Sequence, residues 1–313
     1  MKMVIILCVL SLMIPSVQSA EDCIFVSVGK FHAFWKSVSK GAYDSATKQG
    51  LRVYERSVSK TEDGSVNKEQ IKVLNWNKSK VKCRGIVLAP MDFKIKSVIS
   101  QLKNENYHIM YVDRDDGTNS TIGSIVTNNF KVGEIAAEKM VKKIGTGIAV
   151  AVFKMAPNVK TTGNRVDGFT KRAKELGLEV IVSEFIGDRY KNAQMNSTTL
   201  LKENPQIKGI FTPNETTTLG TYISLKDLNL KRITLIGVDI NERVYEGLKD
   251  GYIYGSILQD PYGMGHRAVE YLKRAMEGEV IRKQVNSEAY FLSRENIKKQ
   301  KSLEMLKGYG VKP

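Results

Sequence analysis

The sequence feature that most constrains the fold is a regular alternation of short apolar runs with longer amphipathic stretches. The apolar runs, such as Ile24–Val28 and Ile233–Val238, are rich in β-branched residues, which is typical of buried strands. In the stretches between them, apolar residues recur at helical spacing, as Trp35, Val38 and Ala42 do. Strands that alternate with helices form parallel sheets covered by helices on both faces. The sequence therefore predicts an α/β fold.

The alternation falls into two similar halves. The predicted strand Gly123–Thr127 closes the first half, and the predicted helix Phe130–Ile144 begins the second. A length of 313 residues suits about two domains, and no low-complexity linker separates the halves. We therefore predict two lobes joined by short crossovers, with one strand and one helix in the tail, Glu288–Lys307.

The first 19 residues have the organisation of a signal peptide. Lys2 precedes an apolar run, Val4–Ile14, of 11 residues. That run is too short to span a bilayer core of about 30 Å. Val17 and Ser19 are small residues at the −3 and −1 positions, so we predict cleavage after Ser19 and export to a Gram-negative periplasm. The alternative is an uncleaved N-terminal anchor.

The chain is strongly basic, with 48 Lys and Arg against 33 Asp and Glu and a net charge of +15. Loss of Lys2 with the signal peptide lowers this charge to +14. Such an excess can indicate nucleic acid or an anionic membrane as a partner. The lysines are scattered, however, and no basic block is interleaved with aromatic residues. We therefore expect a solvated basic surface and no nucleic-acid partner.

Two of the three cysteines, Cys23 and Cys83, remain after the predicted cleavage. Each comes immediately before a predicted strand, so the two lie close together if these strands are neighbours in one parallel sheet. In an oxidising compartment they would then form a disulfide. Two buried free thiols are the alternative. The chain has no Cys-x-x-Cys pair to begin a zinc site, and we expect no metal and no cofactor.

Polar and aromatic residues gather where predicted strands end. Ligands of open α/β sheets bind beyond the carboxyl ends of the strands. A sugar offers hydroxyls to planar donors and acceptors such as Asp, Asn and Arg, and an apolar ring face to aromatic side chains. The strand-end residues of this chain have that composition. They include Trp35, Asp113, Arg114, Asn128, Asn129, Arg165, Asp188, Tyr190, Asn214, Asp239 and Gln259.

Seven segments in order carry a resemblance to a known family. They are Ala33-Phe34-Trp35, Val112-Asp113-Arg114, Thr127-Asn128-Asn129, Asn164-Arg165-Val166-Asp167-Gly168-Phe169, Thr212-Pro213-Asn214-Glu215, Ile236-Gly237-Val238-Asp239 and Ile257-Leu258-Gln259. On these segments the chain resembles the periplasmic sugar-binding proteins of ABC importers. It is most similar to the ribose/galactose type, which is related to the sensor domains of LacI-like repressors. The resemblance implies a two-lobed periplasmic binding protein of type I, with the ligand in the cleft.

The resemblance also implies roles for eight residues. The ring of the sugar would lie against two aromatic side chains, and its hydroxyls would bind polar side chains from both lobes. Three of these residues have another reading: Trp35 as core packing, Asp239 as a helix cap and Arg165 as a surface charge. Asn129, a further candidate, could instead cap the following helix. The eight implied ligand-binding residues are Phe34, Trp35, Asp113, Arg114, Arg165, Asn214, Asp239 and Gln259.

Three further candidates, Lys30, Asn129 and Tyr190, come from positions where the chain departs from the family pattern or leaves a choice open. Lys30-Phe31-His32 stands where ribose binders often carry Asn, and Lys30 and His32 could favour an anionic or modified sugar. Tyr190 stands near the place of an expected aromatic, and Glu215 follows Asn214 where Asp is common. These departures leave the identity of the ligand open.

We therefore predict a periplasmic, monomeric solute-binding protein that captures a monosaccharide by hinge closure and delivers it to an ABC permease. The alternative is a sensing subunit that presents a sugar-like autoinducer or inducer to a sensor kinase or chemoreceptor. The isolated histidines and the absence of catalytic motifs argue against an enzyme. The predicted division is a signal peptide over 1–19, an N-terminal lobe of 20–127 with 260–285, and a C-terminal lobe of 128–259 with 286–313.

Overall fold

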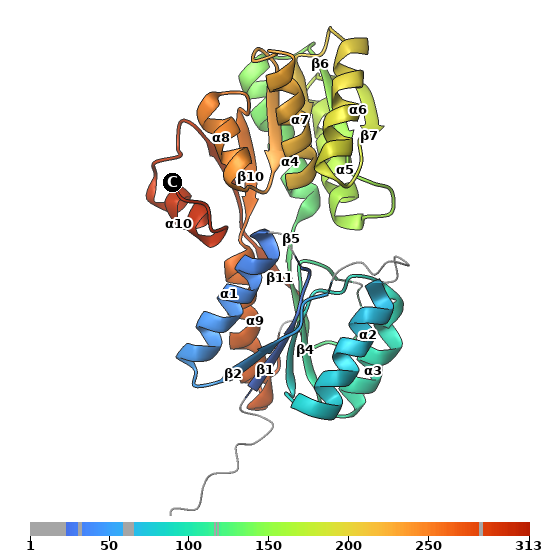
Figure 1. Cartoon of the computed structure of the whole chain (residues 1–313), viewed down its shortest axis with the longest axis vertical. Coiled ribbons are helices and arrows are strands. Elements are labelled where there is room, and N and C mark those ends of the chain that lie inside the picture. The colour runs from blue at the N-terminus through green and yellow to red at the C-terminus, as the bar shows by residue number, and fades with distance from the viewer. Residues whose placement is uncertain (1–22, 31–32, 59–65, 116, 118, 282–283) are drawn as a thin grey trace, which may run out of the picture.

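The computed structural model describes residues 23–30, 33–58, 66–115, 117, 119–281 and 284–313. These residues form two α/β lobes that meet at a narrow junction (Figure 1). The predicted signal peptide and the Phe31-His32 pair lie outside the described residues. In the described part of the chain, no helix is a candidate for crossing a bilayer.

The first lobe contains a six-stranded sheet in the order β11-β5-β4-β3-β1-β2, in which every pair of neighbours is parallel. Its strands are β1 (Cys23–Ser27), β2 (Arg52–Glu55), β3 (Gly85–Leu88), β4 (His108–Val112), β5 (Gly123–Thr127) and β11 (Gln284–Ser287). Its helical segments are α1 (Ala33–Lys48), α2 (Val66–Trp76), η1 (Asn77–Val81), η2 (Phe93–Ile95), α3 (Lys96–Asn104) and α9 (Pro261–Met276).

The second lobe contains a six-stranded sheet in the order β12-β10-β9-β8-β6-β7. Its strands are β6 (Ala149–Lys154), β7 (Glu179–Phe185), β8 (Gly209–Phe211), β9 (Thr234–Val238), β10 (Gly255–Gln259) and β12 (Ala289–Ser293). Its helices are α4 (Asn129–Ile144), α5 (Lys160–Glu175), α6 (Tyr190–Glu203), α7 (Glu215–Asp227), α8 (Glu242–Asp250) and α10 (Gln300–Gly308).

Both faces of the inner strands of each sheet are buried, which explains the continuous apolar runs in the sequence. In β1, Ile24 and Val26 pack in the cluster that includes α1 and α9, whereas Phe25 packs in the cluster that includes α2 and α3. In β6, Ala151 and Val152 divide between two clusters in the same way. The predicted α/β fold with parallel sheets and helices on both faces is confirmed.

One strand, β12, departs from the parallel arrangement, since it runs antiparallel to β10. It follows β11, which is parallel to β5 and therefore ends at the same edge of the first sheet as β5. The chain enters the second lobe from the junction, where the carboxyl ends of the parallel strands already lie. A strand that begins at this edge has to run in the opposite direction.

A disulfide joins Cys23 to Cys83 at the amino ends of β1 and β3. The two strands are parallel neighbours, with Ile24 opposite Gly85, and the two Cα atoms lie 5.2 Å apart. Both cysteines are buried. The disulfide therefore fastens the first strand of the described chain to the centre of its sheet.

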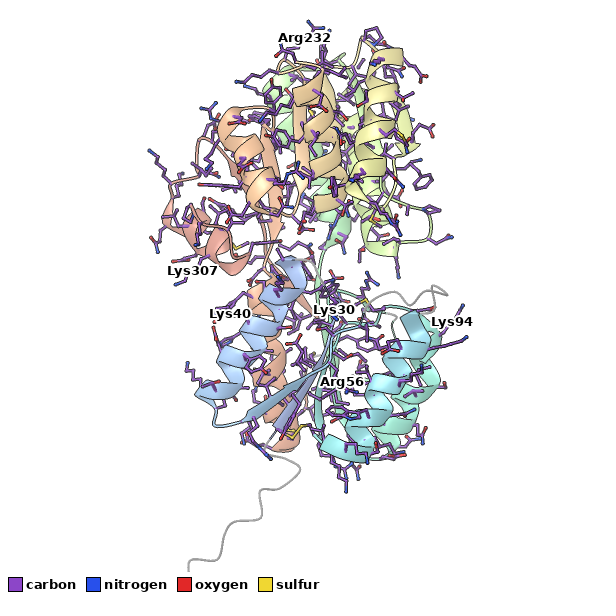
Figure 2. The ribbon with its side chains drawn as sticks, in the orientation of Figure 1. Lys30, Lys40, Arg56, Lys94, Arg232 and Lys307 are labelled. Atoms are coloured by element: carbon purple, nitrogen blue, oxygen red, sulfur yellow. A yellow bond between two sulfur atoms is a disulfide. The ribbon has the colours of Figure 1, made fainter. Side chains whose placement is uncertain are left out.

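The basic side chains are distributed over the whole molecule. Figure 2 shows Lys40, Arg56 and Lys94 on the first lobe, Arg232 and Lys307 on the second, and Lys30 near the junction. Several others lie over aromatic rings, for example Arg84 over Tyr107 at 4.6 Å. Such a distribution is that of a solvated surface with a spread positive charge.

Candidate ligand-binding cleft

A cleft of about 1450 Å³ separates the two lobes. It lies at the carboxyl ends of the parallel strands of both sheets, where ligands of open α/β folds bind. The sequence implied eight ligand-binding residues and three further candidates, and ten of these eleven line the cleft. They are Lys30, Phe34, Trp35, Asp113, Arg114, Asn129, Arg165, Asn214, Asp239 and Gln259.

The two lobes present an aspartate to the cleft by the same turn. Asp113 follows β4 and Asp239 follows β9, and each has a φ of 66°, in the left-handed region. The backbone N–H of Asp113 donates to Ile125 O, and that of Asp239 to Ile257 O, each at 3.0 Å on the neighbouring strand. Aspartate tolerates this conformation better than most residues. The turn ends each strand and directs a carboxylate into the cleft.

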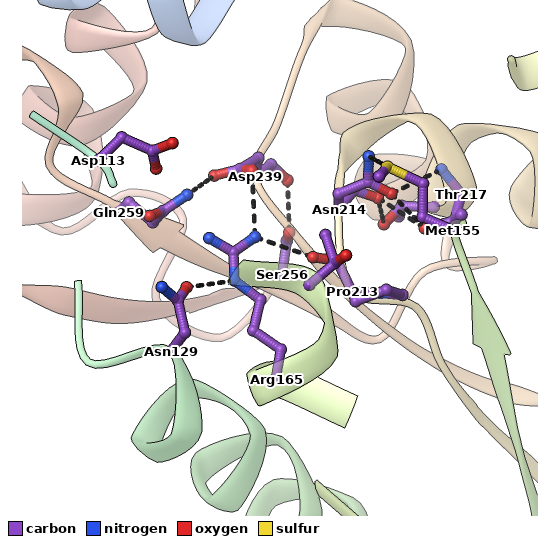
Figure 3. Close-up of polar contacts among 12 residues, drawn as sticks. Asp113, Asn129, Met155, Arg165, Pro213, Asn214, Thr217, Asp239, Ser256 and Gln259 are labelled. Atoms are coloured by element: carbon purple, nitrogen blue, oxygen red, sulfur yellow. Dashed lines mark hydrogen bonds and ion pairs between the residues drawn. The ribbon is translucent and has the colours of Figure 1, made fainter. Parts of the chain in front are cut away.

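Arg165 is the buried centre of the polar network in the second lobe (Figure 3). Its Nε donates to Asn129 Oδ1 at 2.7 Å, and its Nη1 donates to Pro213 O at 2.8 Å. Nη1 also lies 3.7 Å from Asp239 Oδ2, in an ion pair. Only 3% of Arg165 is exposed, so the reading as a surface charge does not hold.

Asn129 and Arg165 meet because α4 and α5 pack with their backbones in contact. A Cβ added to Gly133 would lie 2.0 Å from Arg165 O, and one added to Gly168 would lie 2.0 Å from Phe130 O. Only glycine permits this approach. The cap of α4 is Asn128, whose side chain accepts from Lys131 N at 3.0 Å. The side chain of Asn129 is therefore free for Arg165.

Asp239 and Gln259 are joined by a hydrogen bond at the end of β10. Gln259 Nε2 donates to Asp239 Oδ1 at 2.8 Å. Gln259 Oε1 and Thr127 Oγ1 are buried without a hydrogen-bond partner among the described residues, and both residues line the cleft. An unsatisfied buried oxygen costs free energy, and a ligand hydroxyl would remove that cost. Asp239 does not cap α8, because Asn241 does.

In the first lobe, Asp113 and Arg114 form the corresponding polar pair. Arg114 Nε lies 3.4 Å from Asp113 Oδ2, and its Nη1 donates to Met91 O at 3.2 Å. Burial raises the pKa of Asp113, while the positive charges of Arg114 and Arg165 lower it. Arg165 belongs to the other lobe, so charges from both lobes act on the carboxyl group of Asp113. Figure 3 draws Asp113 together with Gln259 and Asp239.

Two aromatic side chains at the start of α1 supply the apolar wall. The rings of Phe34 and Trp35 are perpendicular, with centroids 4.9 Å apart, and both side chains are mostly buried. A Cβ at Gly29 would lie 2.3 Å from Trp35 Nε1, so the indole packs directly on the backbone after β1. Trp35 thus belongs to the core and to the cleft at once.

Asn214 caps α7 and lines the cleft. Its Oδ1 accepts from Thr217 N at 3.2 Å and from Thr217 Oγ1 at 2.6 Å. Its Nδ2 lies 3.1 Å from Met155 Sδ. The side chain is therefore held in place by the helix that it caps, and its amide nitrogen faces a thioether sulfur, which is only a weak hydrogen-bond acceptor.

Lys30 and Tyr190 have different positions. Lys30 is exposed and lies at the rim of the cleft. Tyr190 begins α6, is 39% exposed, and has the guanidinium of Arg243 over its ring at 5.6 Å. It is not among the described residues that line the cleft, whereas its neighbours Asp188 and Arg189 are.

The structure adds two residues to the site. Glu215 accepts from Asn241 Nδ2 at 2.8 Å, and burial raises its pKa to about 7, with a further contribution from Asp239. Tyr309, from the C-terminal segment, donates through its hydroxyl to Asp239 Oδ1 at 2.8 Å. The sequence marked Glu215 only as a departure from the family pattern. It carried no signal for Tyr309, which is 70 residues away from its partner.

Two α/β lobes with a polar cleft between the carboxyl ends of their sheets define a bilobal ligand-binding protein. Residues 24–279 match the periplasmic binding protein domain, and the chain belongs to this family of non-enzymatic solute-binding proteins. The resemblance and the type I fold that the sequence indicated are therefore confirmed. In the described residues, no group of three or more His, Cys, Asp or Glu is arranged to hold a metal ion.

The chain is similar to binding proteins for several sugars. It is 24% identical over 256 residues to the ribose import binding protein of Bacillus subtilis (strain 168), covering 81% of each chain. It is 22% identical over 239 residues to the D-apiose import binding protein of Actinobacillus succinogenes, covering 75% of this chain and 76% of that one. A solute-binding protein from Agrobacterium vitis with bound D-fucose superposes with a TM-score of 0.81 at 25% identity, covering 90% and 99% of the two chains.

Proposed function

We propose that this protein captures a neutral monosaccharide in the cleft and delivers it to the permease of an ABC importer. The observation that carries the proposal is the convergence of polar side chains from both lobes on one cleft beside an aromatic wall. Asp113 and Arg114 come from one lobe, and Arg165, Asp239 and Gln259 come from the other. Fixed planar donors and acceptors of this kind suit adjacent sugar hydroxyls.

The charge balance of the cleft supports a neutral ligand over an anionic one. Among the described residues that line it, six are Asp or Glu and five are Lys or Arg. The guanidinium of Arg165 is paired with Asp239, and that of Arg114 with Asp113. A phosphate or carboxylate would therefore meet carboxylates from both lobes. The names of the relatives, which refer to ribose, apiose and allose, agree with a neutral monosaccharide.

Binding requires the lobes to approach each other. The cleft holds about 1450 Å³, more than the about 300–1,000 Å³ of ordinary small-ligand pockets. A sugar that contacts both lobes would stabilise a closed form at the expense of the open one. The chain crosses between the sheets after β5, after β10 and after β11, and we place the hinge at these three segments.

Export through the predicted signal peptide fits the Cys23–Cys83 disulfide, since disulfides persist in oxidising compartments.

A thermal-shift screen tests the proposal. The mature chain is heated with D-ribose, D-apiose, D-allose, D-arabinose, D-fucose, D-tagatose, ribose 5-phosphate and an autoinducer-type furanose. At 100 times its dissociation constant, a ligand adds about 2.7 kcal/mol of apparent stability. We expect one neutral sugar to raise the melting temperature, and the shift to disappear in Asp113→Asn.

The other outcomes point elsewhere. A shift with the sugar phosphate alone would overturn the neutral-sugar assignment. A shift with the furanose alone would favour a sensing subunit over an importer. A surface substitution, Asp250→Asn, serves as the matched control, because Asp250 pairs with Lys226 on the exposed face of the second lobe. It should leave every shift unchanged.

A further inference from the structure

The C-terminal segment inserts a tyrosine hydroxyl beneath the cleft. Tyr309 follows α10, which lies beside the junction of the lobes (Figure 1), and only 4% of its surface is exposed. Its hydroxyl donates to Asp239 Oδ1 at 2.8 Å and accepts from the backbone N–H of Gln259 at 3.2 Å. The hydroxyl thus connects a carboxylate of the cleft to the last residue of β10, where the chain crosses to the other lobe.

These contacts divide the two oxygens of the Asp239 carboxylate between different partners. Oδ1 accepts from Tyr309 and from Gln259 Nε2, each at 2.8 Å, so two protein donors occupy it. Oδ2 has Arg165 Nη1 at 3.7 Å, beyond hydrogen-bond distance. A ligand hydroxyl in the cleft can therefore donate to Oδ2 without displacing a protein donor.

The hydroxyl of Tyr309 is suited to this permanent role. Burial raises its pKa well above the ordinary value for tyrosine, and the neighbouring Asp239 charge adds to the effect. The hydroxyl therefore stays protonated and continues to donate. The equivalent carboxylate of the first lobe, Asp113, is held differently, through its chain neighbour Arg114 at 3.4 Å.

We propose that Tyr309 is a positioning residue of the ligand site, which holds Asp239 so that Oδ2 contacts the sugar and which fixes this carboxylate to the crossover at Gln259. The proposal rests on the proposed sugar-binding function. It assigns to the C-terminal segment a part in ligand selection, because the orientation of one carboxylate decides which arrangement of hydroxyls it can accept.

The first test needs no ligand. Tyr309→Phe removes the hydroxyl and keeps the ring in the core, and Tyr290→Phe is the matched control. Tyr290 also joins the C-terminal segment through its hydroxyl, which lies 2.9 Å from Ser302 Oγ, but it does not contact Asp239. Hydrogen exchange by NMR should show the Gln259 amide exchanging at least about tenfold faster in Tyr309→Phe and unchanged in Tyr290→Phe. Unchanged protection in Tyr309→Phe would overturn the proposal.

The second test measures ligand selection by titration calorimetry with D-ribose and its C2 epimer D-arabinose. We expect Tyr309→Phe to lower the affinity for the preferred epimer by about tenfold and to reduce the ratio of the two affinities. Tyr290→Phe should change neither affinity. Equal weakening of both epimers, as a general loss of stability would produce, would overturn the proposal. If the parent protein binds no neutral sugar, the proposed function fails, and the exchange measurement still decides whether Tyr309 fixes the crossover at Gln259.

Discussion

Replacing Asp239 with Asn is the most informative perturbation of the cleft. Asn has nearly the same shape and tolerates the left-handed φ of 66° at this position, so the change removes the charge with little strain. Its side-chain oxygen can still accept from Gln259 and Tyr309. The amide nitrogen then faces Arg165 in place of Oδ2, which sets a donor against a donor.

The contacts give the expected magnitudes. Removing one member of a buried ion pair costs about 3–5 kcal/mol. Arg165 keeps its hydrogen bonds to Asn129 and Pro213, and the pair is separated by 3.7 Å. We therefore expect the free energy of unfolding to fall by less, about 2–3 kcal/mol. A hydrogen bond from a sugar hydroxyl to a charged group contributes about 1.5–3 kcal/mol, so affinity should fall about 10- to 150-fold.

Urea denaturation and titration calorimetry with the sugar found in the thermal screen measure the two effects separately. Asp250→Asn is the control: it removes the carboxylate of an exposed pair, 3.3 Å from Lys226, and should cost less than about 1 kcal/mol with no change in affinity. If Asp239→Asn binds the sugar as tightly as the parent protein, the carboxylate does not contact the ligand. A loss of stability without a loss of affinity would leave Asp239 a purely structural role.

Three further predictions concern stability. The pKa of Glu215 is raised from 4.5 to about 7, so between these pH values the folded protein holds a proton that the unfolded chain releases. The free energy of unfolding therefore falls as the pH rises through this window. Glu215→Gln should remove this fall and be more stable than the parent by up to about 3 kcal/mol at pH 8, but not at pH 4. Reducing the Cys23–Cys83 disulfide, which spans 60 residues, should lower the free energy of unfolding by about 4 kcal/mol in urea melts. Asn128→Ala should cost about 1 kcal/mol as a lost cap, and Asn129→Ala more, because it leaves the Nε of a buried arginine without an acceptor.

Each of these predictions has a result that would contradict it. An equal gain of stability in Glu215→Gln at pH 4 and pH 8 would show that ionisation of Glu215 is not the cause. The control is Glu184→Gln, which changes an exposed glutamate of the same lobe. Equal urea midpoints with and without reductant would show that the disulfide does not constrain the unfolded chain. A larger loss in Asn128→Ala than in Asn129→Ala would reverse the roles assigned to these neighbours.

Local periodicity predicted the order of strands and helices well, because inner strands that are buried on both faces leave continuous apolar runs in the sequence. It did not predict β11, Gln284–Ser287, as a strand. This segment is mostly polar and joins the edge of the first sheet beside β5, so pairing rather than apolar burial makes it a strand. The antiparallel direction of β12 could not be predicted from the sequence either, since it depends on the edge of the second sheet at which the chain enters that lobe.

The sequence by itself determined the α/β class, the division into two lobes and the strand-end positions from which a ligand could be contacted. These properties follow from patterns of a few residues and from the geometry shared by all parallel sheets. Only the tertiary structure decided that Asn128 caps α4 while Asn129 binds Arg165, and that Tyr190 does not line the cleft. It alone placed Tyr309 against Asp239, because contacts between distant segments depend on how helices and lobes pack, which no local pattern encodes.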